Sequence, residues 1–129
     1  GGVIAALLPC TSLYLNKSFA RARDMIAHGI PVAVATDFNP GSCPSLNIGL
    51  CMTMAYLKYR MTPEEILSAV TINAACAVNR GGSTGTIEPG KKADMVIWNA
   101  EDMEMLCYRM GSNLAGTVIK NGAIVKNNI

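Results

Sequence analysis

The fold is decided by the stretch Pro31-Val32-Ala33-Val34-Ala35-Thr36-Asp37-Phe38-Asn39-Pro40-Gly41-Ser42. Its apolar part, 32–35, follows a proline, has the length of a strand and lacks the polar alternation of a strand exposed on one face. Such runs are typical of strands buried on both faces, as in parallel α/β sheets. The stretch therefore predicts a buried strand that leads to Asp37 and is followed by a loop rich in proline and glycine.

A second apolar run lies upstream, at Val3–Leu8, and closes at Pro9. It predicts another strand buried on both faces, with a loop after it. Asn16 is expected to cap a helix over 17–27 that stops at Gly29. The order strand, helix, strand is that of a βαβ unit, whose two strands lie parallel.

Downstream, the pattern changes to helices. Residues 46–59 are apolar on nearly every side of a helix, so this helix needs covering on most of its surface. A helix start follows at Thr62-Pro63-Glu64-Glu65, with an N-cap threonine, a proline at the first helical position and a glutamate three residues after the cap. That helix, or a second one restarting near Thr71, is expected to run to Asn79.

Beyond Gly82 the chain becomes rich in strands and turns. Residues 94–98 predict a strand, and 117–125 predict a hairpin that turns at Asn121-Gly122. A lone ribbon cannot bury two apolar faces, so this sheet is expected to need further partners. The apolar pairs expected across the hairpin are Val118 with Val125 and Ile119 with Ile124.

Length and composition limit the chain to a single unit. It has 129 residues, of which 50% are hydrophobic and only 16% are charged, and its mean hydropathy is +0.28. Ordinary soluble domains carry roughly 25% charged residues, and a small domain exposes much of its surface. We therefore expect a piece of a larger protein, in which other polypeptide covers part of this surface.

Charge and hydropathy exclude two classes of partner. The net charge is +2 and the basic residues are scattered apart from Lys91-Lys92, so nucleic acid is not an expected partner. The longest apolar stretch of helical length, 46–57, is shorter than the roughly 20 residues that cross a bilayer, so no membrane span is expected. A homodimer stays open as an alternative.

The five cysteines favour a cytoplasmic location. They are odd in number and include no CxxC pair, which fits neither a disulfide framework nor a zinc ribbon. Free thiols in a reducing compartment are the simplest interpretation. A thiol redox protein is the alternative, and it requires a cysteine of low pKa.

Asp37 is the residue whose position points to chemistry. In β/α architectures, active-site groups lie at the carboxyl ends of the strands, where side chains leave the packed interior. A carboxylate placed there can ligate a metal ion or act as a general base. The structural alternative is an aspartate that only caps the loop or the next helix.

Four stretches of the chain resemble the metal-dependent amidohydrolase superfamily. The segment 31–42 resembles the eighth-strand segment of the imidazolonepropionase family, and the part from Asp37 to Ser42 is specific to that family. Three later stretches, 61–65, 70–75 and 85–94, resemble segments of amidohydrolases at large. The resemblance covers essentially the whole chain but only about the last third of such an enzyme, since a (β/α)8 barrel alone takes about 250 residues.

The resemblance implies a fold and a reaction. The fold is α/β and incomplete, with the C-terminal strand-helix units of a (β/α)8 amidohydrolase barrel over 1–82 and strands of a small accessory β-sandwich domain over 83–129. The reaction is the hydrolytic opening of the ring amide of 4-imidazolone-5-propanoate to N-formimidoyl-L-glutamate, in histidine degradation. The expected partner is therefore a small-molecule substrate.

The resemblance also implies the residues of the site. Asp37 is implied as the carboxylate ligand of a single zinc or iron ion and as an acceptor for a proton of the attacking water. Asn39, Gly41 and Ser42 are implied as substrate contacts, and ordinary turn chemistry is their alternative.

The remaining ligands of such a metal site are not in this sequence. The superfamily completes its site with an HxH pair and further histidines, whereas this chain has only His28, which we interpret as a helix cap. Because a catalytic zinc normally needs three protein ligands, the chain alone is expected to bind no metal and to be inactive without the missing N-terminal part of the same polypeptide. Another amidohydrolase, such as a deaminase or a cyclic amidase, and a non-catalytic interaction module are the alternatives.

Overall fold

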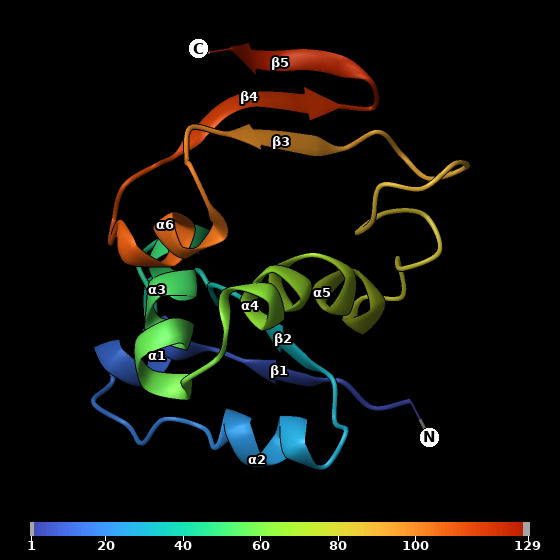
Figure 1. Cartoon of the computed structure of the whole chain (residues 1–129). Coiled ribbons are helices and arrows are strands. Elements are labelled where there is room, and N and C mark those ends of the chain that lie inside the picture. The colour runs from blue at the N-terminus through green and yellow to red at the C-terminus, as the bar shows by residue number, and fades with distance from the viewer. Residues whose placement is uncertain (1, 128–129) are drawn as a thin grey trace.

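The structure is a computed structural model that describes residues 2–127. Figure 1 shows a pair of strands, a group of helices and a second sheet, with most of the helices between the two sheets and α2 on the other side of the strand pair. The predicted segments 1–82 and 83–129 include residues 1, 128 and 129, which lie outside the described residues. The elements in chain order are β1 (Ala5–Leu7), α1 (Pro9–Tyr14), α2 (Ala22–Ala27), β2 (Val32–Val34), α3 (Ile48–Tyr59), α4 (Pro63–Val70), α5 (Ile72–Ala77), β3 (Met95–Trp98), α6 (Met103–Tyr108), β4 (Ala115–Lys120) and β5 (Ala123–Asn127).

The strands β1 and β2 run parallel, as the βαβ order predicted. Ala5 lies opposite Val32, and Leu7 lies opposite Val34. All three residues of β2 are buried, because α3, α4 and α5 pack against this strand. In β1 only Leu7 is buried and Ala6 is exposed, so the expectation of burial on both faces is right for β2 and wrong for β1.

The connection between these strands holds two short helices where the sequence predicted a loop and one longer helix. Pro9 is the first residue of α1, where its missing N–H has no helical partner to lose. Asn16 does not cap a helix: it lies just after α1 in the left-handed conformation, with φ +50°. Asparagine adopts this conformation more readily than most residues, so Asn16 follows the end of one helix, and α2 starts only at Ala22. Gly29, at φ +71°, follows the end of α2 as predicted.

The helix α3 lies in the middle of the helical group. Its side-chain cap is Asn47, whose Oδ1 accepts a hydrogen bond from the Leu50 N–H at 3.1 Å. Helices α1, α4 and α6 all pack against it, which covers much of its apolar surface, although Tyr56 and Leu57 remain exposed. Its buried residues are Cys51, Met52, Thr53, Met54, Ala55 and Tyr59.

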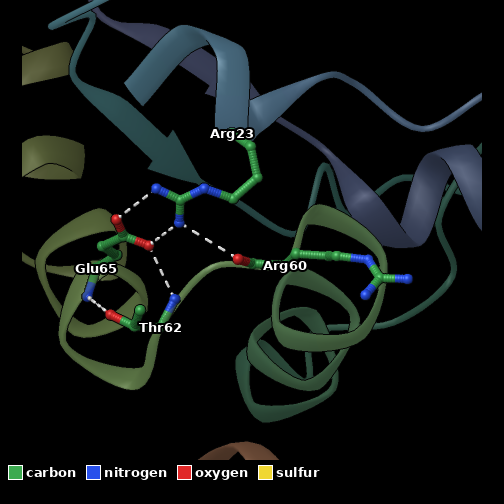
Figure 2. A network of polar contacts seen from close by, with 4 residues as sticks. All are labelled: Arg23, Arg60, Thr62 and Glu65. Atoms are coloured by element: carbon green, nitrogen blue, oxygen red, sulfur yellow. Dashed lines mark hydrogen bonds and ion pairs between the residues drawn. The ribbon is translucent and has the colours of Figure 1, made fainter. Parts of the chain in front are cut away.

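The helix α4 begins at the predicted capping box. The Thr62 Oγ1 accepts from the Glu65 N–H at 3.3 Å, and the Thr62 N–H donates to Glu65 Oε2 at 2.8 Å. Figure 2 shows that Arg23 of α2 contacts the same carboxylate. Beyond the break at Thr71, Asn73 Nδ2 of α5 donates to the Val32 carbonyl at 2.8 Å, which fixes α5 to the start of β2.

The second sheet is antiparallel, with β4 between β3 and β5. The hairpin turns at Asn121-Gly122 as predicted, and both residues have the positive φ that the commonest two-residue hairpin turn requires. Ile119 faces Ile124 as expected. Val118 pairs with Lys126 and not with Val125, because the register shifts between Val118 and Ile119, as a β-bulge does.

A further helix, α6, was not predicted. Its cap is Asp102, whose Oδ1 accepts from the Met105 N–H at 2.8 Å. It packs on α3 and α4 and places Leu106 and Cys107 in the core. None of the helices within residues 2–127 has both the length and the apolar character needed to span a bilayer.

Candidate active site

The carboxyl ends of β1 and β2 meet at one edge of the strand pair, because the two strands are parallel. The Ala35 N–H just beyond β2 donates to the Leu7 carbonyl at 3.1 Å, so the two chain segments stay together as they leave the sheet. Asp37 follows two residues later, while α1 begins directly after β1. As a result, Thr11 of α1 donates from Oγ1 to Asp37 Oδ2 at 2.9 Å.

Asp37 has an unusual backbone conformation. Its φ is +55°, in the left-handed region, which aspartate and asparagine adopt more readily than most other residues with a side chain. This conformation turns the chain just after β2 and starts the loop. The side chain is half-buried, so its carboxylate remains within reach of solutes.

The loop after Asp37 is organised by the side chain of Asn39. Asn39 Oδ1 accepts from the N–H groups of Gly41 and Ser42, both at 2.8 Å. Asn39 Nδ2 donates to the Asp37 carbonyl at 2.7 Å and to Ser42 Oγ at 2.6 Å. Because an amide side chain offers two donors and one oxygen with two lone pairs, these four bonds use it fully within the loop.

Ser42 brings the loop back to the carboxylate. Its Oγ donates to Asp37 Oδ2 at 3.1 Å, the same oxygen that Thr11 contacts. The structure thus places Asp37, Asn39, Gly41 and Ser42, the residues named from the sequence, in one cluster. Within residues 2–127 no backbone N–H donates to the Asp37 carboxylate, but its bond to Ser42 lies within its own loop, so the structural alternative of an aspartate that organises this loop stays open.

Thr11 is the member of this cluster that the sequence analysis missed. It was passed over because residues 9–16 were expected to form a loop. A usable signal was nevertheless present, since a proline directly after a buried strand favours a helical start there. Because β1 and β2 are parallel, the first turn of α1, which follows β1, then lies beside the residues that follow β2.

The described residues do not form a metal site by themselves. Within residues 2–127 there is no group of three or more His, Cys, Asp and Glu side chains that could hold a metal ion. Asp37 fits one ligand position, as a carboxylate at a strand end, but a catalytic zinc needs three protein ligands. His28 lies at the end of α2, where its Nδ1 contacts the Asp24 carbonyl at 2.7 Å, which confirms its interpretation as a cap.

The thiols near the site are not activated. Cys10 and Cys51 are buried with their sulfur atoms 3.3 Å apart. Burial raises the pKa of both thiols, and it raises the pKa of Cys107 to about 11. A redox-active cysteine needs a lowered pKa, so these three thiols argue against the redox alternative.

A hollow of about 400 Å³ lies at the other end of the strand pair. It is lined by residues before and at the start of β2, including Ile30 and Pro31, and by Met61 and Asn73. Asp37 is not part of its lining. This hollow therefore lies apart from the cluster at the carboxyl ends of the strands.

Comparison with known proteins gives the chain its family context. The model of the Amidohydrolase family matches residues 2–125. An imidazolonepropionase of Bacillus cytotoxicus is 55% identical over 120 residues, which is 92% of this chain and 28% of that protein. The resemblance to imidazolonepropionases found in the sequence is thereby confirmed, and the chain spans less than a third of the length of such a relative.

Two solved structures share the fold. An adenosine deaminase from Xanthomonas campestris with bound zinc has a TM-score of 0.87 and 22% identity, covering 98% of this chain and 33% of that one. The atrazine chlorohydrolase of Arthrobacter aurescens, complexed with zinc, has a TM-score of 0.86 and 24% identity, covering 98% of this chain and 32% of that one. The family model matches nearly the whole chain, and the fold is shared with these two structures: this chain belongs to the amidohydrolase family.

Proposed function

We propose that the protein to which this chain belongs is an imidazolonepropionase, which hydrolyses the ring amide of 4-imidazolone-5-propanoate to N-formimidoyl-L-glutamate in histidine degradation. The observation that carries the proposal is the Asp37 carboxylate, which lies just beyond β2 and is held on one oxygen by Thr11 and Ser42. The identity of 55% to an imidazolonepropionase supports the choice of substrate. The similarity to the two zinc-containing structures supports only the fold, because their sequence identity to this chain is low.

Asp37 has two roles in this proposal. Its carboxylate would be one ligand of a single zinc or iron ion, and the carboxylate oxygen that does not bind the ion would accept a proton from the attacking water. When bound, the ion polarises the amide carbonyl and makes water a stronger nucleophile at neutral pH. The other ligands come from polypeptide that is not in this chain, so the chain by itself is expected to bind no metal and to be inactive.

Asn39, Gly41 and Ser42 are the proposed substrate contacts. Their side chains and N–H groups bond to one another in the structure, so contact with the imidazolone ring or its propanoate arm requires an exchange of partners. The Ser42 hydroxyl is the easiest to exchange, because Thr11 continues to hold Asp37 when Ser42 turns away.

The architecture of the whole enzyme is part of the proposal. We assign residues 1–82 to the C-terminal strand-helix units of a (β/α)8 barrel, and residues 83–129 to the accessory β-sandwich domain. The parallel pair β1 and β2 supports the first assignment, since barrel strands are parallel. The antiparallel order of β3, β4 and β5 supports the second. We also propose a cytoplasmic location on the basis of the free cysteines, and we keep a homodimer as an alternative for sedimentation to decide.

The test is the activity of the full-length protein on 4-imidazolone-5-propanoate, measured as loss of the ring chromophore. We expect Asp37→Asn to lower turnover by about 10²- to 10⁴-fold, the usual effect of removing a general acid-base group. Asp24→Asn is the matched control, because Asp24 is a surface aspartate that pairs with Arg21 on α2. Normal turnover and normal metal content in the Asp37→Asn variant would contradict the proposed role.

The other amidohydrolases are distinguished by substrate in the same assay. Adenine and guanine nucleosides and bases test for a deaminase, and dihydroorotate tests for a cyclic amidase. Turnover of any of these with none of the imidazolone would replace the proposed substrate but keep the role of Asp37. A full-length protein that binds no metal and turns over none of them would favour the non-catalytic interaction module.

A further inference from the structure

We propose that Thr11 is a positioning residue that sets the orientation of the Asp37 carboxylate and leaves Oδ1 as its working oxygen. The inference rests on the proposed function of Asp37 and names the residue that enables it. Its basis is the bond of 2.9 Å between Thr11 Oγ1 and Asp37 Oδ2.

The direction of this hydrogen bond follows from the chemistry of the two groups. An ionised carboxylate has no proton and can only accept, so the single proton of the Thr11 hydroxyl is donated to Oδ2. The Ser42 hydroxyl donates to the same oxygen at 3.1 Å. Within residues 2–127 no hydrogen bond reaches Oδ1, so this oxygen stays available for a ligand or a proton.

Two donors on one oxygen determine how the carboxylate is turned. The terminal torsion of an aspartate is broad, so without such donors the plane of its carboxylate can turn. A pair of fixed donors on Oδ2 removes this freedom. Hydrogen bonds to charged groups are stronger than those between neutral groups, which makes the orientation specific.

Thr11 and Ser42 reach the carboxylate from different parts of the fold. Ser42 belongs to the same loop as Asp37 and also accepts from Asn39, so it moves with that loop. Thr11 belongs to α1, whose first two residues, Pro9 and Cys10, are buried. Thr11 therefore holds Asp37 against a part of the structure that does not depend on the loop.

The difference matters when the substrate binds. The Ser42 hydroxyl has one proton and cannot donate to Asp37 and to a substrate at the same time. If Ser42 turns to the substrate, Thr11 is the remaining donor to Oδ2. The orientation of Asp37 then survives the exchange that the proposed substrate contacts require.

The test compares two substitutions in the full-length protein. Thr11→Val keeps the shape of the side chain and removes the hydroxyl, whereas Thr11→Ser keeps the hydroxyl and removes a methyl group. We measure kcat and KM, the metal retained after dialysis against EDTA, and the thermal midpoint. Residues that orient a ligand from outside the coordination sphere typically change metal affinity or activity by about 10- to 100-fold.

We expect Thr11→Val to lower kcat or metal retention by about this factor, with little change in KM. Thr11→Ser is expected to restore both towards the wild-type values. Thr71→Val is the matched control, because it removes a threonine hydroxyl that bonds to the Leu67 carbonyl, away from Asp37. Adding Thr11→Val to the Asp37→Asn variant should have no further effect on turnover, since Thr11 acts through the carboxylate.

Three results would overturn the inference. These are wild-type kcat and metal retention in Thr11→Val, equal damage in Thr11→Ser and Thr11→Val, and a further full loss in the double variant. If Thr11→Val does not fold, Thr11→Cys takes its place and is compared with Thr11→Ser, because the two side chains have the same connectivity and a thiol is only a weak donor. A wild-type protein that does not hydrolyse the imidazolone refutes the proposed function, whereas metal retention still tests Thr11.

Discussion

Arg23 donates to both carboxylate oxygens of Glu65, and this ion pair joins α2 to the first turn of α4 (Figure 2). The distances are 2.5 Å from Nη1 to Oε2 and 2.9 Å from Nη2 to Oε1. Nη1 also donates to the Arg60 carbonyl at 3.3 Å, while the side chain of Arg60 points away in Figure 2. One arginine thus contacts the end of α3 and the start of α4 together.

The first prediction is a loss of stability in acid that depends on Arg23. Hydrogen bonds from Arg23 hold the pKa of Glu65 below its ordinary value of 4.5. A carboxyl with a lowered pKa in the folded state stabilises the fold above its unfolded pKa, and this contribution is lost as pH falls through the folded pKa. We expect the thermal midpoint of the full-length protein to decrease as the pH is lowered below about 4.5. In Arg23→Met this decrease with pH should be smaller.

Arg21 provides the matched control for this measurement. It lies just before the same helix and pairs with Asp24, but its side chain is 86% exposed. Exposed pairs contribute little to stability, so Arg21→Met should keep the wild-type pH profile. Identical profiles in Arg23→Met and the wild type would show that the ion pair does not stabilise the fold.

The second prediction concerns the loop that carries the proposed substrate contacts. The N–H groups of Gly41 and Ser42 are expected to be protected from hydrogen exchange, because both donate to Asn39 Oδ1. In Asn39→Ala they should exchange about fivefold faster or more, the factor for a net loss of about 1 kcal/mol per bond. Asn39→Asp keeps the accepting oxygen and should keep most of the protection.

Asn113→Ala is the control for the loop. Asn113 Oδ1 accepts from the Ala115 N–H at 3.0 Å in the same kind of turn, before β4. This variant should speed exchange at Ala115 and leave Gly41 and Ser42 unchanged. Equal protection of Gly41 and Ser42 in Asn39→Ala and the wild type would refute the role of Asn39 in the loop.

The third prediction ranks three glycine-to-alanine variants. At Gly85, φ is +98° and an added Cβ would lie 2.9 Å from the Cβ of Ala75 and the Cα of Ile72. At Gly90, φ is +89° but no atom lies within 4 Å, and Gly82 has neither a positive φ nor a close neighbour. We expect Gly82→Ala to be nearly neutral, Gly90→Ala to cost about 1 kcal/mol, and Gly85→Ala to cost more.

Thermal denaturation of the full-length protein checks this order. The comparison of Gly90 with Gly85 separates backbone strain from steric overlap. A Gly85→Ala variant as stable as Gly82→Ala would mean that α5 is not packed on this turn as described.

The fourth prediction is that Cys76 is labelled first among the cysteines of this segment. Cys76 is exposed, whereas the other four are buried. Burial also raises the pKa of Cys10, Cys51 and Cys107, which lowers the fraction of reactive thiolate. Iodoacetamide labelling of the native full-length protein, read by peptide mass, should modify Cys76 well before the rest.

A Cys76→Ser variant completes this test. The remaining four thiols should stay unlabelled until the protein is unfolded. Rapid labelling of Cys10 or Cys51 in the native protein would reopen the thiol redox alternative.

The sequence predicted local features best where the residues involved favour a single backbone conformation or a single capping role. The capping box at Thr62, the stop at Gly29 and the turn at Asn121-Gly122 are all confirmed, because each depends only on neighbours in the chain. Asn16 was misinterpreted because asparagine serves both at helix starts and in left-handed turns. The bulge after Val118 and the exposed face of β1 depend on contacts with distant segments, which the local pattern does not contain.

The candidate site divides in the same way. Asp37 and its loop could be named from the sequence, because a carboxylate after a buried strand has a positional meaning. Thr11 was missed, because its bond to Asp37 joins residues that follow two different strands and requires the parallel pairing of β1 with β2. The proposed substrate rests on the family resemblance. The geometry of this chain shows how the Asp37 carboxylate is oriented.

Because β1 and β2 pair in parallel, the bond between Thr11 and Asp37 depends on the register of the two strands. Each strand is only three residues long. A shift of the register by one residue would move Asp37 by about 3.3 Å relative to Thr11, which takes the two side chains out of hydrogen-bonding range. Deleting one residue within β2 should therefore disconnect the carboxylate even if the strands pair again. Insertions in the exposed segment 15–18 leave the alignment unchanged, so natural variation in length is expected to accumulate there.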